Sequence, residues 1–246
     1  MRQRQVRPRP REPDQDFSMK PNALRAAIEA DRKAGHVPAG VILCIGGTSI
    51  GACDHMPPLL DIAQSEGLYT HIDAAWAGSA MICPEFRNLW DGAGLADSIV
   101  FNPHKWLGAN FDCSVQFLRD PDVQRRTMGL RPSYLETPQA RKVVNFNEWT
   151  VPLGRRFRAL KLWFLIRAYG LEGLRERLSN HVRWTAELCE KLRAQEDFAI
   201  TTEPRLALFT FQWAPHGRDP NEASAELLQA INDGRKQPAG DDAADE

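Results

Sequence analysis

Short apolar runs alternate with helix-like stretches through the first half of the chain. The expected strands are residues 41–45, 69–74, 95–101 and 114–118, and the expected helices are residues 21–34 and 58–66. Gly35 and Gly67 stand where these two helices should end. The run at residues 41–45 is continuously apolar, which is typical of a strand buried on both faces of a parallel sheet. Strands that alternate with helices predict an α/β sheet.

The second half of the chain has a different pattern. Residues 155–169 are densely apolar and long enough to predict a buried helix that Gly170 can cap. In residues 171–192 leucines and other apolar residues recur at steps of three and four, which indicates a long amphipathic helix. Residues 207–213 alternate like a strand with one covered face. These elements set the second half of the chain apart from the first.

Composition narrows the class of protein. The 246 residues include 31 Lys+Arg and 32 Asp+Glu, so the formal net charge is -1, and 43% are hydrophobic. This length predicts one or two domains with a sizeable core, and the charge balance argues against a nucleic-acid or membrane-surface binder. No apolar run reaches the ~18–20 residues that span a bilayer, and the N-terminus lacks the apolar stretch of a secretory signal.

Two further features of composition concern the termini and the cysteines. Residues 1–13 hold five arginines and three prolines, which predicts a disordered, solvated tail. A basic arm that touches nucleic acid or acidic lipid is the alternative. The five cysteines show no spacing of a metal or redox motif, so we expect no metal site and buried, reduced thiols in a cytoplasmic protein.

Candidate chemistry follows two of the predicted strands. Asp73 stands at the end of one apolar strand, and Lys105 comes just after another. In open α/β sheets ligands bind outside the carboxyl ends of the strands. A desolvated lysine amine can form a Schiff base with an aldehyde, and an aspartate can hold a proton on a pyridine nitrogen. Pyridoxal phosphate needs both groups, but a structural ion pair between Asp73 and Lys105 explains this spacing equally well.

The amino-acid sequences of three segments resemble those of a known protein family. HIDAAWAGSAMICPEFR (71–87), ADSIVFNPHKWLGANFDCS (96–114) and VPLGRRFRALKLWFLIRAYG (151–170) closely resemble the aromatic L-amino-acid decarboxylases, which are group II pyridoxal-phosphate-dependent decarboxylases. The resemblance covers about residues 14–215. It implies an α/β fold, namely part of a fold type I (pyridoxal-phosphate-dependent transferase-like) large domain followed by the start of a small α+β domain. It also implies a carboxy-lyase that uses pyridoxal 5'-phosphate.

The resemblance implies roles for individual residues. Lys105 resembles the Schiff-base lysine, and Asp73 resembles the partner of the pyridine nitrogen. Ala75 is similar to the residue packed on one ring face, and Thr48 to the threonine close to the cofactor. The remaining two positions are Asn102, similar to a phosphate-side ligand, and His104, similar to the histidine beside the imine.

Two further positions bear on the reaction and the substrate. Tyr134 resembles the tyrosine of the family's catalytic loop, which can supply or relay a proton after CO2 is lost. Related aldehyde synthases have phenylalanine there, so the tyrosine favours decarboxylation to an amine. Gly154 falls where plant members carry glycine with indole substrates and serine with phenols. The resemblance therefore implies an aromatic amino-acid substrate and a roomy pocket.

The resemblance is partial, because family members are considerably longer. The segment with the phosphate-binding turn and the ring-stacking histidine has no counterpart in residues 1–13. We expect a basic tail at 1–13, a partial cofactor-binding domain at 14–160, a partial small domain at 161–232 and a disordered tail at 233–246. Two hypotheses follow: a working decarboxylase, homodimeric by resemblance, or a truncated and inactive fragment.

Overall fold

The computed structural model describes residues 17–129, 144–152 and 154–234. The two predicted tails and Tyr134 therefore lie wholly or mainly outside the described residues. The chain divides into two compact units: Met1–Thr48 with Ala52–Leu178, and Ser49–Gly51 with Ser179–Glu246. We describe each unit by itself.

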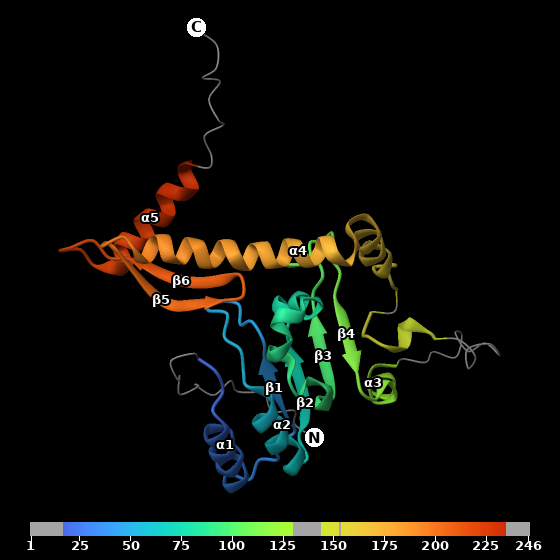
Figure 1. Ribbon diagram of the computed structural model, residues 1–246. Coiled ribbons are helices and arrows are strands. Elements are labelled where there is room, and N and C mark those ends of the chain that lie inside the picture. The colour runs from blue at the N-terminus through green and yellow to red at the C-terminus, as the bar shows by residue number, and fades with distance from the viewer. Residues whose placement is uncertain (1–16, 130–143, 153, 235–246) are drawn as a thin grey trace. The chain divides into compact units, whose positions relative to one another are not determined.

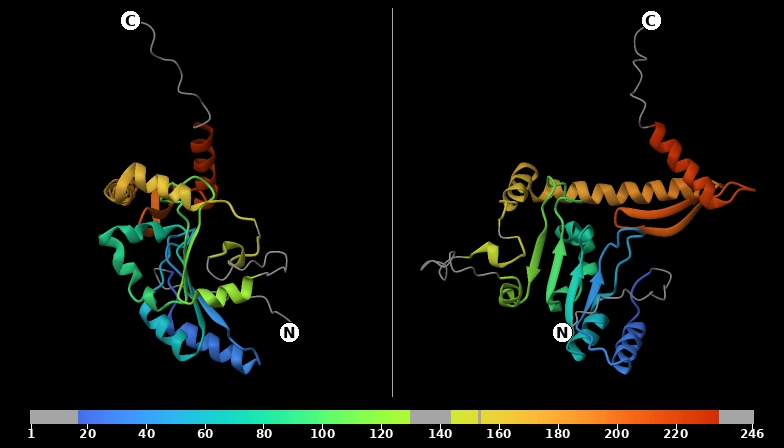
Figure 2. Two further views of the ribbon diagram at one scale, coloured as in Figure 1. Left: turned by 90° about the vertical axis from the view of Figure 1, so that its right-hand side faces the viewer. Right: turned by 180° about the vertical axis from the view of Figure 1, so that it is seen from behind.

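A four-stranded sheet forms the centre of the first unit (Figure 1). Its strands are β1 (Gly40–Cys44), β2 (Tyr69–Asp73), β3 (Ser98–Phe101) and β4 (Val115–Leu118), in the order β1-β2-β3-β4. The first three strands are parallel and β4 runs antiparallel to β3. Figure 2 shows the same strands from behind. All four predicted strands are confirmed to within a few residues, and the mixed α/β class is confirmed with them.

Helices begin and end in this unit where their sequences indicate. The helix α1 (Pro21–Lys33) has proline at its first position and is followed by Gly35 at φ +75°, while α2 (Met56–Ser65) is followed by Gly67 at φ +66°. A positive φ suits glycine, which has no Cβ to clash. The remaining helical elements are η1 (Ala77–Ile82), η2 (Pro84–Trp90), η3 (Ala93–Leu95), α3 (Pro121–Met128) and η5 (Phe146–Glu148).

Only one face of the parallel strands is well covered. Val41, Leu43 and Ile72 are buried on the face that α2 packs against. On the other face Ile42 is 55% exposed and Tyr69 46% exposed. The prediction of a strand buried on both faces was therefore wrong for β1, because a continuous apolar run does not reveal whether cover exists on both sides.

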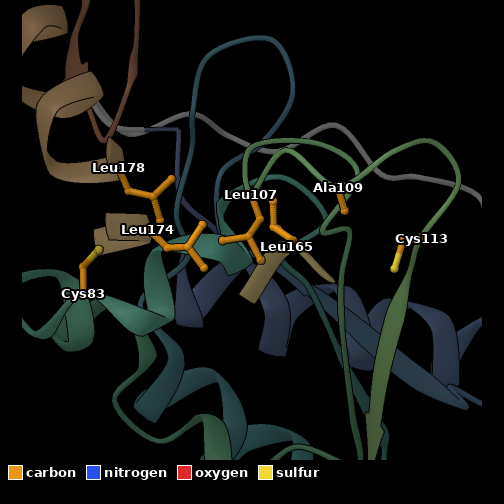
Figure 3. Packing of buried hydrophobic residues seen from close by; sticks show 7 residues of the cluster. All are labelled: Cys83, Leu107, Ala109, Cys113, Leu165, Leu174 and Leu178. Atoms are coloured by element: carbon orange, nitrogen blue, oxygen red, sulfur yellow. The ribbon is translucent and has the colours of Figure 1, made fainter. Parts of the chain in front are cut away.

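The helix α4 (Ala159–Arg193) begins in the first unit and has a non-helical Gly170 inside it. Leu165, Leu174 and Leu178 are buried with Leu107, and Figure 3 shows Leu107, Leu165 and Leu174 gathered in one cluster. The prediction of a buried helix at 155–169 was wrong, since most of the apolar side chains around Leu165 are exposed. Those that are at least 46% exposed are Phe157, Trp163, Phe164, Ile166 and Tyr169.

The second unit joins the remainder of α4 to a two-stranded hairpin and a helix. Strands β5 (Phe198–Arg205) and β6 (Leu208–Trp213) are antiparallel, and α5 (Pro220–Gly234) follows. The strand predicted at 207–213 is confirmed, whereas β5 and α5 were not predicted. The boundary between the units falls at 178/179 rather than at 160/161, because the first part of α4 packs in the core of the first unit.

Candidate functional site

The predicted site residues follow the carboxyl ends of three neighbouring parallel strands. Cys44 of β1 pairs with Asp73 of β2, which pairs with Val100 of β3, so the three strands end side by side. Asp73 is the last residue of β2, and the loops that follow the three strands carry Thr48, Ala75 and the residues Asn102 to Lys105. The structure thus brings the candidates between Thr48 and Lys105 to one edge of one sheet, where ligands bind in open α/β folds.

The loop that carries Thr48 turns back tightly on itself. The backbone N–H groups of Gly46 and Gly47 both donate to the Ala52 carbonyl at 2.9 Å. Gly46 has φ +78°, and a Cβ placed there would lie 2.4 Å from the Ala77 Cβ. Only glycine allows this close approach, so the loop after β1 lies directly against the segment after β2. Thr48 itself is exposed on this loop.

Asp73 presents an exposed carboxylate just beyond the buried part of β2. Its Oδ1 accepts a hydrogen bond from the Ala75 N–H at 3.0 Å, which holds the carboxylate beside the turn. The Ala75 carbonyl in turn accepts from the Asn102 N–H at 2.9 Å. The backbone therefore ties the segment that carries the acid to the segment that carries the lysine.

A pair of indole rings makes a second link between these segments. Trp76 and Trp106 stack with their ring centroids 4.8 Å apart and their planes 16° from parallel. Each tryptophan is next to a predicted chemical group: Trp76 follows Ala75, and Trp106 follows Lys105. Stacked aromatic pairs add stability beyond the area they bury, so this contact helps to hold the two segments together.

The turn after β3 places the amide, the imidazole and the amine in succession. The Lys105 N–H donates to the Asn102 carbonyl at 2.9 Å, and the lysine side chain is exposed. The Ser114 hydroxyl donates to Asn102 Oδ1. Because the amide oxygen is used inside the protein, the amide NH2 is the part of Asn102 that can donate to an anion.

His104 is held by the main chain of Cys113. Its Nδ1 lies 2.6 Å from the Cys113 carbonyl oxygen, and the Cys113 backbone N–H points at the same Nδ1 from 3.1 Å. The His104 backbone N–H also donates to the Cys113 carbonyl at 3.3 Å. The contact to the oxygen is the shorter of the two, and two lone pairs would repel each other at 2.6 Å, so we assign the proton to Nδ1 as donor to the oxygen, and the Cys113 N–H is then without an acceptor at Nδ1. In the neutral ring the lone pair is then on Nε2.

The segment that holds His104 is cross-linked to the start of α4. Asp112 Oδ2 accepts from Arg158 Nε at 3.0 Å and lies 2.9 Å from its NH2 nitrogen. Lys161 Nζ donates to the carbonyls of Phe111 at 2.9 Å and Asp112 at 3.2 Å. The hydrogen bond from Arg158 lowers the pKa of Asp112 to about 2, so the carboxylate stays charged at neutral pH.

His71 lies on the same face of β2 as Asp73 and was not singled out from the sequence. Its Nδ1 is 2.7 Å from the Ser98 hydroxyl. Burial lowers the pKa of His71, and the nearby Asp73 opposes part of that shift. Its position two residues before Asp73 in a strand was the available signal, because residues i and i+2 share a face.

The Asp112–Arg158 pair and Ser114 were also missed. Asp112 and Ser114 lie within the motif at 96–114 and Arg158 within the motif at 151–170, yet nothing local pairs residues 46 positions apart. Tyr134 lies outside the described residues, so its role stays a prediction. Within the described ranges no group of three or more acidic, histidine or cysteine side chains could hold a metal ion.

Comparison with known proteins agrees with this geometry. Residues 4–214 match the model of the pyridoxal-dependent decarboxylase conserved domain. Among curated proteins, an aromatic-L-amino-acid decarboxylase of Mus musculus is 41% identical over 91% of this chain and 46% of its own length. A phenylacetaldehyde synthase of Arabidopsis thaliana is 38% identical over 90% of this chain and 46% of its own.

A solved structure shows the same likeness. Oryza sativa TDC, crystallised with PLP and tryptamine, superposes with a TM-score of 0.84 at 35% identity, over 89% of this chain and 47% of that one. The chain spans about half the length of the curated relatives it matches.

An amine and a carboxylate beyond the carboxyl ends of parallel strands suit the class of pyridoxal-phosphate-dependent proteins, which the comparisons support. The chain belongs to the pyridoxal-dependent decarboxylase family, whose members related to it here include amino-acid carboxy-lyases. Its cofactor is pyridoxal 5'-phosphate, and the predicted family, fold and cofactor are thereby confirmed.

The donor set of the described residues fits this cofactor. Lys105 supplies a primary amine, Asp73 a carboxylate held at a fixed angle by the Ala75 N–H, and Asn102 an amide whose NH2 can face a phosphate. The small side chain of Ala75 leaves space for a flat ring beside that carboxylate. These groups come from adjacent loops that the main chain and the tryptophan stack hold together.

Proposed function

We propose that this chain carries the part of a decarboxylase site that contains the cofactor-binding lysine. The reaction at this site removes the carboxylate of an aromatic L-amino acid as CO2. The observation that carries the proposal is the placement of Lys105 and Asp73 on adjoining loops at one sheet edge, in a chain of this family. The names of the mouse and Arabidopsis relatives indicate two outcomes in this family, decarboxylation and aldehyde formation.

Each residue has a separate task in this proposal. Lys105 would hold the cofactor through its Nζ amine, a group that can form a Schiff base with an aldehyde. Asp73 keeps a proton on the pyridine nitrogen. The bound cofactor supplies an electron sink for the pair left on Cα when the bond to the carboxylate breaks. A proton then replaces CO2 at Cα, and Tyr134 is the proposed donor.

His104 and Asn102 have supporting tasks. The unprotonated Nε2 of His104 can accept a hydrogen bond beside the lysine, since Nδ1 is committed to the Cys113 carbonyl. Asn102 orients the phosphate end, and Thr48 and Ala75 border the ring. Orientation matters because the breaking bond must overlap the π system of the ring.

The decisive experiment is capture of the cofactor on Lys105. Purified chain is mixed with pyridoxal phosphate, and the imine absorption band is followed before and after borohydride reduction. Mass spectrometry should find the reduced adduct on Lys105. Lys105→Arg should lose the band, whereas Lys33→Arg, an exposed substitution on α1, should keep it. An adduct on other lysines alone contradicts the proposal.

A measurement of CO2 release distinguishes two candidate functions of the chain. CO2 and amine from L-tryptophan or L-dopa support a working decarboxylase. A band without CO2 favours the second candidate, an inactive portion of such an enzyme. The second candidate is carried by one observation: the chain spans only 46% of the mouse relative and 47% of the Oryza sativa chain.

Substrate preference is testable at Gly154. A Cβ built there meets no atom within 4 Å. Gly154→Ser therefore introduces a hydroxyl without strain, and a change in activity reports on the substrate rather than on folding. We propose an indole substrate, so the variant should lose activity toward tryptophan relative to dopa. An unchanged ratio contradicts this assignment.

We also propose a homodimer in the cytoplasm. Support for the dimer comes from exposed aromatic side chains on α4, where Trp163 is 53% and Phe164 58% exposed, since such residues are enriched at interfaces. Sedimentation should give a dimer that Trp163→Glu weakens.

Four of the five cysteines are buried as free thiols, which suits a reducing compartment. No helix in the described ranges is long and apolar enough to cross a membrane.

A further inference from the structure

The segment that positions His104 is held mainly by polar contacts. Phe111, at its tip, is 82% exposed, and its ring meets the His104 imidazole edge-on with the centroids 4.8 Å apart. Cys113 is 2% exposed and anchors the far end. Between them the backbone is fixed by the side chains of Arg158 and Lys161.

Three separate contacts join this segment to residues 158–161. Asp112 Oδ2 accepts from Arg158 Nε at 3.0 Å and lies 2.9 Å from the Arg158 NH2 nitrogen, so two nitrogens of the guanidinium meet one carboxylate oxygen. Lys161 Nζ bridges two successive carbonyls, those of Phe111 and Asp112. The Cys113 thiol also donates to the Arg158 carbonyl at 3.7 Å. We name Asp112, Arg158 and Lys161 the clamp.

We propose that the clamp is a positioning device that keeps the His104 imidazole protonated on Nδ1. The clamp does not touch the imidazole. It fixes the Cys113 carbonyl, which accepts Nδ1–H at 2.6 Å and so determines the tautomer. The effect of the clamp on catalysis rests on the function proposed above. The tautomer of His104, in contrast, can be observed in the protein without cofactor.

Loss of the clamp should free the Cys113 carbonyl to shift. A longer, poorly aligned hydrogen bond no longer favours one tautomer, because hydrogen bonds weaken steeply with misalignment. His104 would then exchange between its two neutral forms. The low pKa of Asp112 supports a clamp that stays charged at neutral pH.

Nitrogen NMR of the cofactor-free chain tests this directly. The six histidines are labelled with 15N, and His104 is assigned by comparison with His104→Gln. In the natural sequence we expect one protonated and one unprotonated ring nitrogen. In Asp112→Asn both signals should move toward a common average. Arg158→Lys keeps the charge but loses the Nε–H donor to Asp112 Oδ2, so its shift should be intermediate.

Glu172→Gln is the matched control. Glu172 pairs with Arg175 at 2.7 Å on the same helix, and its side chain is 83% exposed. The substitution therefore removes an ion pair of α4 that is not part of the clamp, and it should leave the His104 signals in place. Averaged His104 signals in the natural sequence, or unchanged signals in both Asp112→Asn and Arg158→Lys, would overturn the proposal.

A milder variant keeps the test open if Asp112→Asn does not fold. Lys161→Gln removes the contacts to the Phe111 and Asp112 carbonyls and leaves the Asp112–Arg158 pair. It should produce a smaller shift of the same sign, and no shift at any clamp variant that folds contradicts the proposal.

The cofactor-loaded chain separates this inference from the proposed function. If the imine band forms, clamp variants should lower kcat about tenfold with little change in KM, since small misplacements of a catalytic group cost rate rather than binding. If no band forms but the NMR shifts occur, the clamp stands and the proposed function fails. If the band forms but the NMR signals do not change, the proposed function stands and the clamp fails.

Discussion

The two faces of the parallel strands carry different kinds of residue. Val41, Leu43 and Ile72 on one face are buried under α2, while Ile42, His71 and Asp73 on the other are exposed or half-buried. These residues alternate along the same strands, because successive side chains point to opposite faces. One face therefore supplies stability and the other presents chemical groups, and substitutions should separate the two.

The largest expected effect comes from the covered face. Leu59 on α2 is fully buried, so Leu59→Ala leaves a cavity and should cost about 2–5 kcal/mol of the free energy of unfolding. Urea denaturation measures it. A loss below about 1 kcal/mol would mean that α2 does not cover the sheet as described.

The next largest effect is expected at Asp54, a buried carboxylate beside β1. Asp54 is 4% exposed and accepts from the backbone N–H groups of Met19 at 2.7 Å and Cys44 at 2.8 Å. Asp54→Ala leaves these donors without that acceptor, which should cost about 1–3 kcal/mol. Asp54→Asn keeps one oxygen and should lose less. Equal losses in the two variants would contradict the role of these hydrogen bonds.

A smaller, pH-dependent effect is expected at His71. Burial lowers its pKa below 6.5 in the folded chain, so the unfolded chain binds more protons. Stability should then fall as the pH drops below about 6.5 and level off below the folded-state pKa. His71→Gln should lack this component, and denaturation between about pH 5 and pH 8 measures it. His55→Gln, at an exposed position, is the control; the same loss of pH dependence there would contradict the assignment.

The smallest effect is expected on the open face. Ile42 is 55% exposed, and Ile42→Thr keeps the β-branched shape that suits a strand. We expect a change within about 0.5 kcal/mol. A loss above about 2 kcal/mol, or one that depends on protein concentration, would show that another chain covers this face in solution.

Local patterns predicted the four strands of the first unit, its helices α1 and α2, and the family of the chain. Apolar runs marked the four strands, glycines marked the ends of α1 and α2, and the motifs around Asp73 and Lys105 marked the family. These signals are local because strand alternation, helix ends and turn residues depend on near neighbours. They failed where burial depends on a partner: Ile42 and the apolar start of α4 were expected inside and are exposed.

The sequence by itself determined which chemical groups are available at the site. A lysine and an aspartate near the ends of apolar strands can be recognised in the sequence, together with the motifs that surround them. Only the tertiary structure decided how those groups are held. The stack of Trp76 on Trp106 and the pairing of Asp112 with Arg158 join residues 30 and 46 positions apart. Contacts of that range arise from chain packing, which no local period encodes.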